Sequence, residues 1–187
     1  MGAAILAKKQ GMGVFVSDLG KIKEEYKNEL LALNIPFEEE QHSEDSILQA
    51  SLIIKSPGIP DKAPLIKKAK EKNIQIISEI EFAYRYSKSK IIAITGSNGK
   101  TTTTSLIYHI LEKAGYDVGL GGNIGTSFAR QVAHGDKAYF VLEISSFQLD
   151  GCIDFKPHIA VLCNITEDHL DRYNYKFENY ISSKLSI

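Results

Sequence analysis

The feature that most constrains this chain is an apolar strand that leads directly through a glycine-rich loop into a helix. Residues Ile91–Thr95 form the apolar run, the loop Gly96–Thr101 reads Gly-Ser-Asn-Gly-Lys-Thr, and apolar side chains then recur at helical spacing as far as Ala114. Glycines let a backbone approach an anion, the N–H groups at a helix start point toward it, and Lys100 adds a positive charge. Thr101 supplies a hydroxyl that can bind Mg²⁺. We therefore predict a phosphate-binding loop.

This loop is shorter than the standard P-loop, because Ile94 stands where the pattern G-x-x-x-x-G-K-[ST] has its first glycine. The alternative interpretation is a glycine turn followed by an unrelated lysine. Four consecutive threonines, Thr101–Thr104, make a poor start to a helix unless their hydroxyls are needed. This run favours the functional interpretation.

The rest of the chain alternates short apolar strands with helical segments, which predicts an α/β fold with parallel sheets and crossover helices. In the first half we expect strands at 14–18, 51–54 and 74–77 and helices at 21–33, 62–72 and 78–86. Asp61 is the expected N-cap of the helix at 62–72. In the second half we expect strands at 117–120, 138–144 and 158–163, and a last helix that starts near 176 and still runs at 187.

A short polar linker, Ser87–Lys90, leads us to place a domain boundary after residue 88. The first domain, 1–88, is Rossmann-like, but the strand and glycine-rich turn with which such domains begin are missing. We therefore expect the natural start to lie upstream of Met1, or the first strand to have been lost. The second domain, 89–187, is expected to be a P-loop-type parallel α/β domain that is incomplete at its end.

Composition and charge exclude several classes of protein. The chain has 22 basic and 23 acidic residues and a formal net charge of −1, which excludes a broad polybasic nucleic-acid binder. No apolar run approaches the roughly 20 residues that a membrane-spanning helix needs. The start of the chain is apolar too briefly for a signal peptide. We expect a cytoplasmic protein without nucleic-acid or membrane partners.

Two further predicted strands end in polar side chains. Glu143 ends the apolar run 139–142 and is followed by Ser145–Gln148, while Asn164–Tyr173 packs three acids, an arginine and His169 into ten residues. Carboxyl ends of parallel strands meet at one edge of a sheet, beside the predicted phosphate loop. An exposed glutamate and a structural histidine are the alternative interpretations. The two strand ends together favour a Mg²⁺ site.

Together these segments resemble the Mur ligase family of ATP-dependent amide-forming enzymes. The loop Thr95–Thr102 is similar to the ATP loop that this family shares with folylpolyglutamate synthases. The segments Gly121–Gly125, Glu143–Leu149 and Asn164–Tyr173 are more specific, and their order resembles the D-glutamate-adding branch of the family. The resemblance covers nearly the whole chain, as a first domain and a portion of a central domain.

The resemblance implies an ATP site with two Mg²⁺ ions. The implied ATP-binding residues are Thr95, Gly96, Ser97, Asn98, Gly99, Lys100, Thr101 and Thr102. Thr101 and Glu143 would hold one ion, and Glu143 and His169 would help hold the second. Lys184 falls where the family carries a carbamylated lysine, which requires a neutral amine and therefore a lowered pKa. The implied catalytic residues are Lys100, Glu143, His169 and Lys184.

The implied substrates are UDP-N-acetylmuramoyl-L-alanine and D-glutamate, joined through an acyl phosphate in the synthesis of peptidoglycan precursors. The residues expected to contact the UDP-sugar are Asp18, Ser56, Pro57, Gly58, Asn123, Ser145 and His169. The family's C-terminal domain, which binds D-glutamate, would lie downstream of Ile187. We therefore expect no ligase activity from this polypeptide alone, and weakened nucleotide binding.

Two alternatives remain open from the sequence. The first is another amide ligase with the same ATP loop, such as a folylpolyglutamate synthase or another Mur ligase, and the residues after Glu143 argue against it. The second is a non-catalytic nucleotide-binding module, which would bind ATP and Mg²⁺ without transferring phosphate to a carboxylate. We expect the complete enzyme to be a monomer. A sheet edge left open by a missing first strand could pair two copies of this chain.

Overall fold

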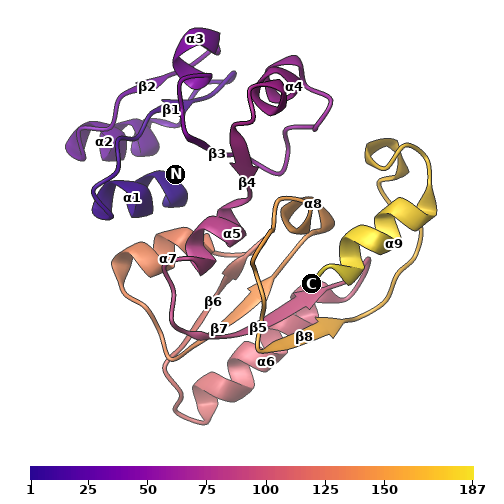
Figure 1. Ribbon diagram of the computed structural model, residues 1–187. Coiled ribbons are helices and arrows are strands. Elements are labelled where there is room, and N and C mark those ends of the chain that lie inside the picture. The colour runs from indigo at the N-terminus through magenta and orange to yellow at the C-terminus, as the bar shows by residue number, and fades with distance from the viewer.

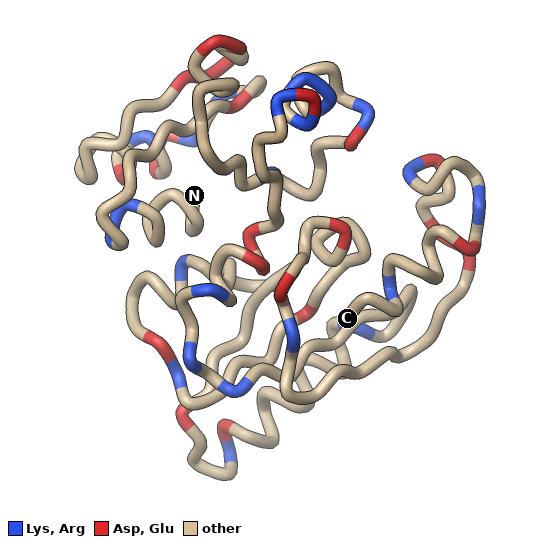
Figure 2. Tube along the Cα trace, viewed as in Figure 1, with Lys and Arg blue, Asp and Glu red and all other residues tan.

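The computed structural model describes all 187 residues and has two lobes that are stacked in Figure 1. The upper lobe contains two small sheets, and the lower lobe contains a single sheet of four strands. Every strand pair is parallel. This confirms the predicted α/β class. Acidic and basic residues are interspersed over both lobes (Figure 2).

The upper lobe consists of short elements around two strand pairs. Its helices are α1 (Gly2–Lys9), α2 (Glu24–Ala32), α3 (Glu44–Ile47), α4 (Pro64–Glu71) and α5 (Glu79–Tyr84). Its strands are β1 (Val16–Ser17), β2 (Phe37–Glu38), β3 (Leu52–Ile54) and β4 (Gln75–Ile77). Strand β1 pairs with β2, and β3 pairs with β4.

Several expectations for the upper lobe need correction. The strand expected at 14–18 is limited to Val16–Ser17, the helix expected at 21–33 begins at Glu24, and β2 and α3 were not predicted. Asp61 does not cap α4, whose N-cap is Ala63 with Pro64 at the first helical position. Proline fixes the helix start without a side-chain cap. Asp61 instead pairs with Lys55 and Lys70.

The lower lobe contains the larger sheet and the elements that surround it. Its strands are β5 (Lys90–Thr95), β6 (Val118–Gly122), β7 (Tyr139–Glu143) and β8 (Ile159–Leu162), in the spatial order β6-β7-β5-β8. Its helices are α6 (Lys100–Lys113), α7 (Phe128–His134), α8 (Ser146–Leu149), the 3-10 helix η1 (Leu170–Arg172) and α9 (Phe177–Leu185). In Figure 1, α6 lies below the sheet and α5 and α7 lie above it.

One apolar core joins the two lobes. Phe140 and Leu142 of β7 are fully buried, and they belong to the same cluster as Leu6 of α1, Ile80 of α5 and Phe128 of α7. Helices of the upper lobe therefore cover a face of the larger sheet, and their burial provides the main stabilising term. Because this core spans both sides of residue 88, the division into domains 1–88 and 89–187 stays a prediction.

In the lower lobe, the structure differs from the sequence-based expectation at the ends of elements and in its short helices. The last helix ends at Leu185, with Ser186 as its C-cap, instead of running to the end of the chain. Helices α7 and α8 were not predicted. The expected linker 87–90 already enters β5 at Lys90, and the Asp136 carboxylate accepts hydrogen bonds from Ser87, Lys88 and Ser89. Every helix is too short or too polar to span a lipid bilayer.

Candidate active site

The predicted phosphate loop connects the carboxyl end of β5 to the start of α6. Gly96 has φ +148°, and a Cβ there would lie 3.0 Å from Cys163 Cβ and 3.2 Å from Asn164 N. Gly99 has φ +81° and is the N-cap of α6. Side chains are disfavoured at both positions: Gly96 packs closely against the segment after β8, and Gly99 is exposed, where an anion can approach its backbone.

The segment after β8 fastens this loop. Ser97 N donates to Asn164 O (3.0 Å), and Ser97 Oγ donates to Thr166 O and accepts from Thr166 N, both at 2.9 Å. The Asn164 side chain accepts from Asn98 N and donates to Asn98 O, also at 2.9 Å. The Tyr180 hydroxyl lies 3.0 Å from Ser97 Oγ. The loop is therefore held in place by hydrogen bonds before any ligand binds.

Lys100 folds back over the loop. Its Nζ donates to the carbonyl oxygens of Gly96 (2.8 Å) and Ser97 (2.9 Å). The ammonium group has no carboxylate partner among the ion pairs of the chain. A phosphate entering the loop would offer this cation a charged acceptor in place of two neutral ones.

Glu143 joins two of the predicted segments. It ends β7 between its neighbours in β5 and β6, and its side chain is almost fully buried. Its Oε2 accepts from Thr101 Oγ1 at 2.7 Å, and its Oε1 accepts from Asn123 Nδ2 at 2.8 Å. Its backbone oxygen also accepts from Asn123 N at 2.8 Å. The phosphate loop and the Gly-Gly-Asn turn thus meet at one carboxylate.

Lys184 also reaches the loop, from α9. Its side chain is 2% exposed, and its Nζ donates to the same Gly96 oxygen at 2.9 Å and lies 4.6 Å from the ring centroid of Tyr180. Burial, reinforced by the positive charge of Lys100, lowers the pKa of Lys184 to about 8. A substantial neutral fraction near physiological pH is what carbamylation requires.

His169 does not join this group. Its side chain is 53% exposed, its Nε2 lies 3.5 Å from Asp168 Oδ2, and its ring packs beside that of Phe147. No hydrogen bond or ion pair links it to Glu143 or Lys184, and no three His, Cys, Asp or Glu side chains form a metal-binding group. The expected role of His169 stays a prediction.

The remaining predicted residues lie around the strand ends. Ser145 caps α8, where its Oγ accepts from Gln148 N. Asp18 accepts from Gly20 N at the end of β1. Ser56, Pro57 and Gly58 form the turn after β3, and Thr102 is exposed in the first turn of α6.

The residues present fit a magnesium-bound polyphosphate. The loop offers backbone amides and an ammonium group, and the Thr101 hydroxyl and the Glu143 carboxylate are hard oxygen ligands of the kind Mg²⁺ prefers. Thr95 Oγ1, at the end of β5 directly before the loop, is buried without a hydrogen-bond partner. Buried polar atoms normally have a partner, so this one indicates a missing water or ligand.

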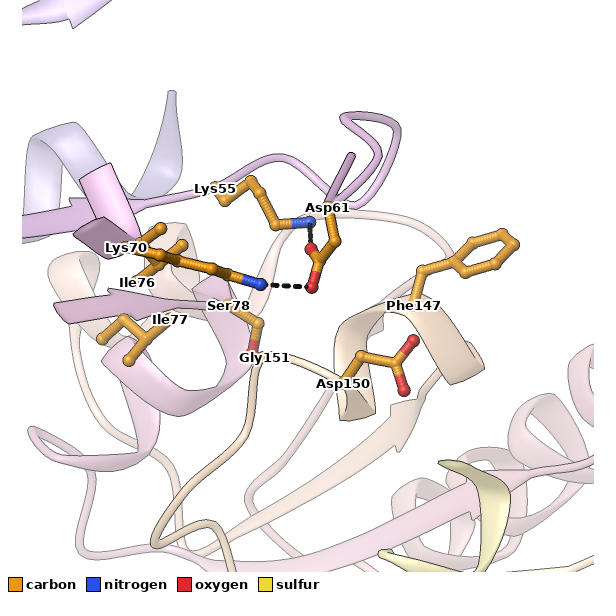
Figure 3. Close-up of a pocket in the computed structure, with 9 residues that line it drawn as sticks. All are labelled: Lys55, Asp61, Lys70, Ile76, Ile77, Ser78, Phe147, Asp150 and Gly151. Atoms are coloured by element: carbon orange, nitrogen blue, oxygen red, sulfur yellow. Dashed lines mark hydrogen bonds and ion pairs between the residues drawn. The ribbon is translucent and has the colours of Figure 1, made fainter. Parts of the chain in front are cut away.

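Two hollows lie beside these elements. A cleft of about 690 Å³ borders the turn Gly122–Gly125 and is also lined by Tyr26 and Glu29 of α2 and by Arg130 of α7. A smaller cavity of about 160 Å³ separates α4 and β4 from α8 (Figure 3). In it, Lys55 and Lys70 both point toward Asp61.

Sequence reasoning missed the residues that hold the loop in place. Thr166 and Tyr180 were not singled out, although Tyr180 stands one helical turn before Lys184 and so lies on the same face of α9. Arg172, whose guanidinium lies over the ring of Phe147, was noted only as one charge in a polar segment.

Comparisons with known proteins match both the first and the second half of the chain. A family model described as the Mur ligase middle domain matches residues 94–187, and one described as the MurD N-terminal domain matches residues 3–64. A protein of Christiangramia forsetii named UDP-N-acetylmuramoylalanine–D-glutamate ligase is 59% identical over 187 residues, and a protein of the same name from Cytophaga hutchinsonii is 60% identical over 189. Both alignments include the whole of this chain but 42% of the relative's length.

A solved structure gives the same result for the fold. The crystal structure of UDP-N-acetylmuramate-alanine ligase MurC from Thermotoga maritima superimposes with a TM-score of 0.57 at 26% sequence identity. The match covers 97% of this chain and 42% of that protein. The chain thus spans less than half the length of the relatives it matches.

Proposed function

Because the chain belongs to the Mur ligase family, we propose that it supplies the ATP site and some of the UDP-sugar site of a ligase that adds D-glutamate to UDP-N-acetylmuramoyl-L-alanine. Two relatives with that name share 59% and 60% of their aligned residues with it. The observation that carries the proposal is the Glu143 carboxylate, which bonds both Thr101 of the phosphate loop and Asn123 of the neighbouring turn. The reaction belongs to the synthesis of peptidoglycan precursors, and we place it in the cytoplasm.

The proposed chemistry has two steps. The alanyl carboxylate attacks the γ-phosphorus of ATP, ADP leaves, and an acyl phosphate forms. The amine of D-glutamate then attacks the acyl carbon, phosphate leaves, and the nitrogen loses a proton. Catalysis of this kind depends on positioning and on neutralising charge more than on covalent chemistry by the protein.

The residues of the loop have defined tasks in this scheme. Lys100 turns from the Gly96 and Ser97 carbonyls to the β- and γ-phosphates. The amides of residues 96–99 bind phosphate oxygens, and Thr101 and Thr102 follow at the helix start. Mg²⁺, when bound, reduces the repulsion between the triphosphate and the attacking carboxylate. Thr101 and Glu143 would hold one ion, and Glu143 and His169 would help to hold the second.

Lys184 is proposed to act as a carbamate. Its neutral nitrogen would bond to the carbon of CO₂ and release a proton to solvent, which converts a buried cation into an anionic oxygen ligand. Its 2% exposure, its lowered pKa and the lack of a carboxylate partner support this role. A permanently charged lysine in this place would be costly to bury without a counter-ion.

The UDP-sugar is proposed to lie between the two lobes of the molecule. Its contacts would come from Asp18, the turn Ser56–Gly58, Asn123 and Ser145. Asn123 lies in the turn Gly122–Gly125, and Gly122 and Gly125 of this turn border the cleft of about 690 Å³. Domain 1–88 would then contribute mainly to this substrate and domain 89–187 mainly to ATP.

A chimera tests the proposal in a complete enzyme. This chain would replace the 187 matching residues of the Christiangramia forsetii relative, and hydroxylamine would trap the acyl phosphate in the absence of D-glutamate. We expect hydroxamate only when ATP, Mg²⁺ and UDP-N-acetylmuramoyl-L-alanine are all present. Glu143→Gln should abolish the signal, whereas Glu112→Gln, a change on the outer face of α6, should preserve it.

Two other outcomes would favour the alternatives. Binding of ATP and Mg²⁺ without phosphate transfer to any carboxylate would indicate a nucleotide-binding module. Trapping with a folate or with another UDP-muramoyl substrate, in place of the alanyl one, would indicate another amide ligase.

A further inference from the structure

We propose that Arg172 is a positioning residue that fastens the turn Ser56–Gly58 of the upper lobe to the lower lobe of the molecule. The tie itself is a structural property of this chain. Its consequence for the UDP-sugar rests on the proposed function, in which Ser56 belongs to one side of the substrate site and Ser145 to the other.

Arg172 joins its own segment to two others. Its Nη2 donates to Pro57 O at 3.2 Å, and its Nη1 makes a longer contact of 3.5 Å with Gly58 O. The guanidinium carbon lies 4.4 Å from the ring centroid of Phe147 in α8. Arg172 itself ends η1, in the segment after β8. One side chain therefore connects the residues that follow β3, β7 and β8.

The Phe147 ring on which Arg172 packs is itself held in place. The ring of Phe147 stacks on that of Tyr173, with centroids 5.9 Å apart and an interplanar angle of 11°. The buried Tyr173 hydroxyl donates to Asp150 Oδ2 at 2.9 Å. A guanidinium held against such a ring can move little, so its donors point in a defined direction.

The chemistry selects arginine over lysine. A guanidinium is flat, so it can stack on an aromatic face while its in-plane N–H groups reach two successive carbonyls. An ammonium group could make one of these interactions but not both. Arg172 takes no part in any ion pair of the chain. Its charge is directed at the turn and the ring.

The turn has no other hydrogen bond to the lower lobe. Within the upper lobe, Ile59 N donates to Ser56 O and Lys55 Nζ donates to Ile59 O. Ser56 and Gly58 are exposed, and nothing lies within 4 Å of a Cβ built on Gly58. Removing Arg172 would therefore free the turn with respect to the lower lobe.

The rest of the interface does not depend on Arg172. Glu29 and Arg130 form a bidentate pair at 2.6 Å between α2 and α7, and Glu81 accepts from three backbone N–H groups of residues 153–155. The shared apolar core joins the same two lobes. Loss of Arg172 should change the turn locally and leave the fold intact.

Hydrogen exchange of the 187-residue chain tests the tie without any ligand. We compare Arg172→Gln and Arg172→Lys with the matched control Lys176→Met, which removes an exposed positive charge four residues later. Arg172→Gln should exchange about tenfold faster in peptides covering residues 55–60, and Arg172→Lys, which keeps one of the two interactions, should show a smaller increase, while peptides of β5 and β7 keep their protection in both. Unchanged exchange at 55–60, or equal acceleration throughout β5 and β7, would overturn the proposal.

A binding arm separates this inference from the proposed function. In the chimera described above, with UDP-N-acetylmuramoyl-L-alanine as the probe, Arg172→Gln should weaken binding about tenfold, whereas ATP affinity and the Lys176→Met control stay unchanged. Equal loss of ATP affinity would contradict a role confined to the turn. If the unaltered chimera does not bind the UDP-sugar, the proposed function is contradicted, and the exchange result alone decides whether Arg172 holds the turn.

Discussion

Thr101 Oγ1 donates a hydrogen bond of 2.7 Å to Glu143 Oε2, across 42 residues of sequence. This bond joins the first turn of the helix after the phosphate loop to the end of the neighbouring strand. Thr101 Oγ1 and Glu143 Oε2 are therefore close enough to bind one cation together. The relationship was expected from the sequence, because carboxyl ends of adjacent parallel strands lie at one edge of a sheet.

The first prediction concerns this pair. Glu143→Gln keeps the shape of the side chain and an acceptor for Asn123 but removes the negative charge, so Mg²⁺-dependent ATP binding should weaken about 10- to 100-fold. Titration calorimetry with and without Mg²⁺ measures the effect. Binding of ATP without Mg²⁺ should change little, and Glu112→Gln should match the unaltered chain. An equal loss with and without the metal would argue that Glu143 shapes the loop instead of holding the ion.

How much of this site the sequence could predict depends on how local each signal is. Glycines, a lysine and hydroxyl residues between a strand and a helix lie within one continuous segment, so the sequence alone predicts a phosphate loop there. Glu143 could be predicted because a carboxylate directly after an apolar strand stands out. Thr166 and Tyr180 carry no such mark, because their importance comes only from hydrogen bonds with Ser97 made on folding.

The same distinction explains the errors in the fold. Strands of two residues, such as Val16–Ser17 and Phe37–Glu38, are too short for any periodicity to show. Helix α7 begins at Phe128 after Ser127, whose side chain caps it, but its few apolar residues resemble a loop in sequence. Leu106 and Ile110 lie on the predicted apolar side of α6, yet each is 56% exposed. Sequence identifies an apolar stripe but not what covers it.

The second prediction is a pH dependence that comes from Lys184. Its pKa is lowered from 10.5 to about 8 in the folded chain, mainly by burial. Between these values the unfolded chain binds more protons than the folded one, so this group makes the free energy of unfolding rise as pH increases from about 8 to 10.5. Urea denaturation in EDTA measures this pH dependence as the difference in the free energy of unfolding between the unaltered chain and Lys184→Met. The free energy of unfolding of the unaltered chain should rise relative to that of the variant across this pH window. Parallel pH profiles would contradict the burial effect.

The third prediction tests the turn beside Glu143. Gly122 has φ +95°, and a Cβ there would overlap the Glu143 carbonyl oxygen. Gly122→Ala should therefore lower the free energy of unfolding by about 1–3 kcal/mol. Gly13→Ala is the matched control, because nothing lies within 4 Å of its Cβ and its φ is not positive. Urea denaturation compares the two variants, and equal midpoints would show that the turn can adjust to a side chain.

The last prediction concerns Glu81, which joins α5 to the segment before β8. Burial alone would raise the pKa of this carboxyl, but hydrogen bonds from the N–H groups of residues 153–155 and from Arg85 outweigh burial and lower it. Glu81→Gln removes the charge that these donors face, so it should lower the free energy of unfolding by about 2 kcal/mol at pH 7.

The pH profile separates this charge effect from a change in packing. Because the pKa of Glu81 is lower in the folded chain than its usual 4.5, the stabilisation is present above that value and disappears as pH falls through the folded-state pKa. The difference between the unaltered chain and Glu81→Gln, measured by urea denaturation, should therefore shrink below pH 4.5. Glu71→Gln, at the exposed end of α4, should show no difference at either pH. A gap that stays constant with pH would mean that the variant disturbs packing, and the carboxylate charge would then not be what holds residues 153–155.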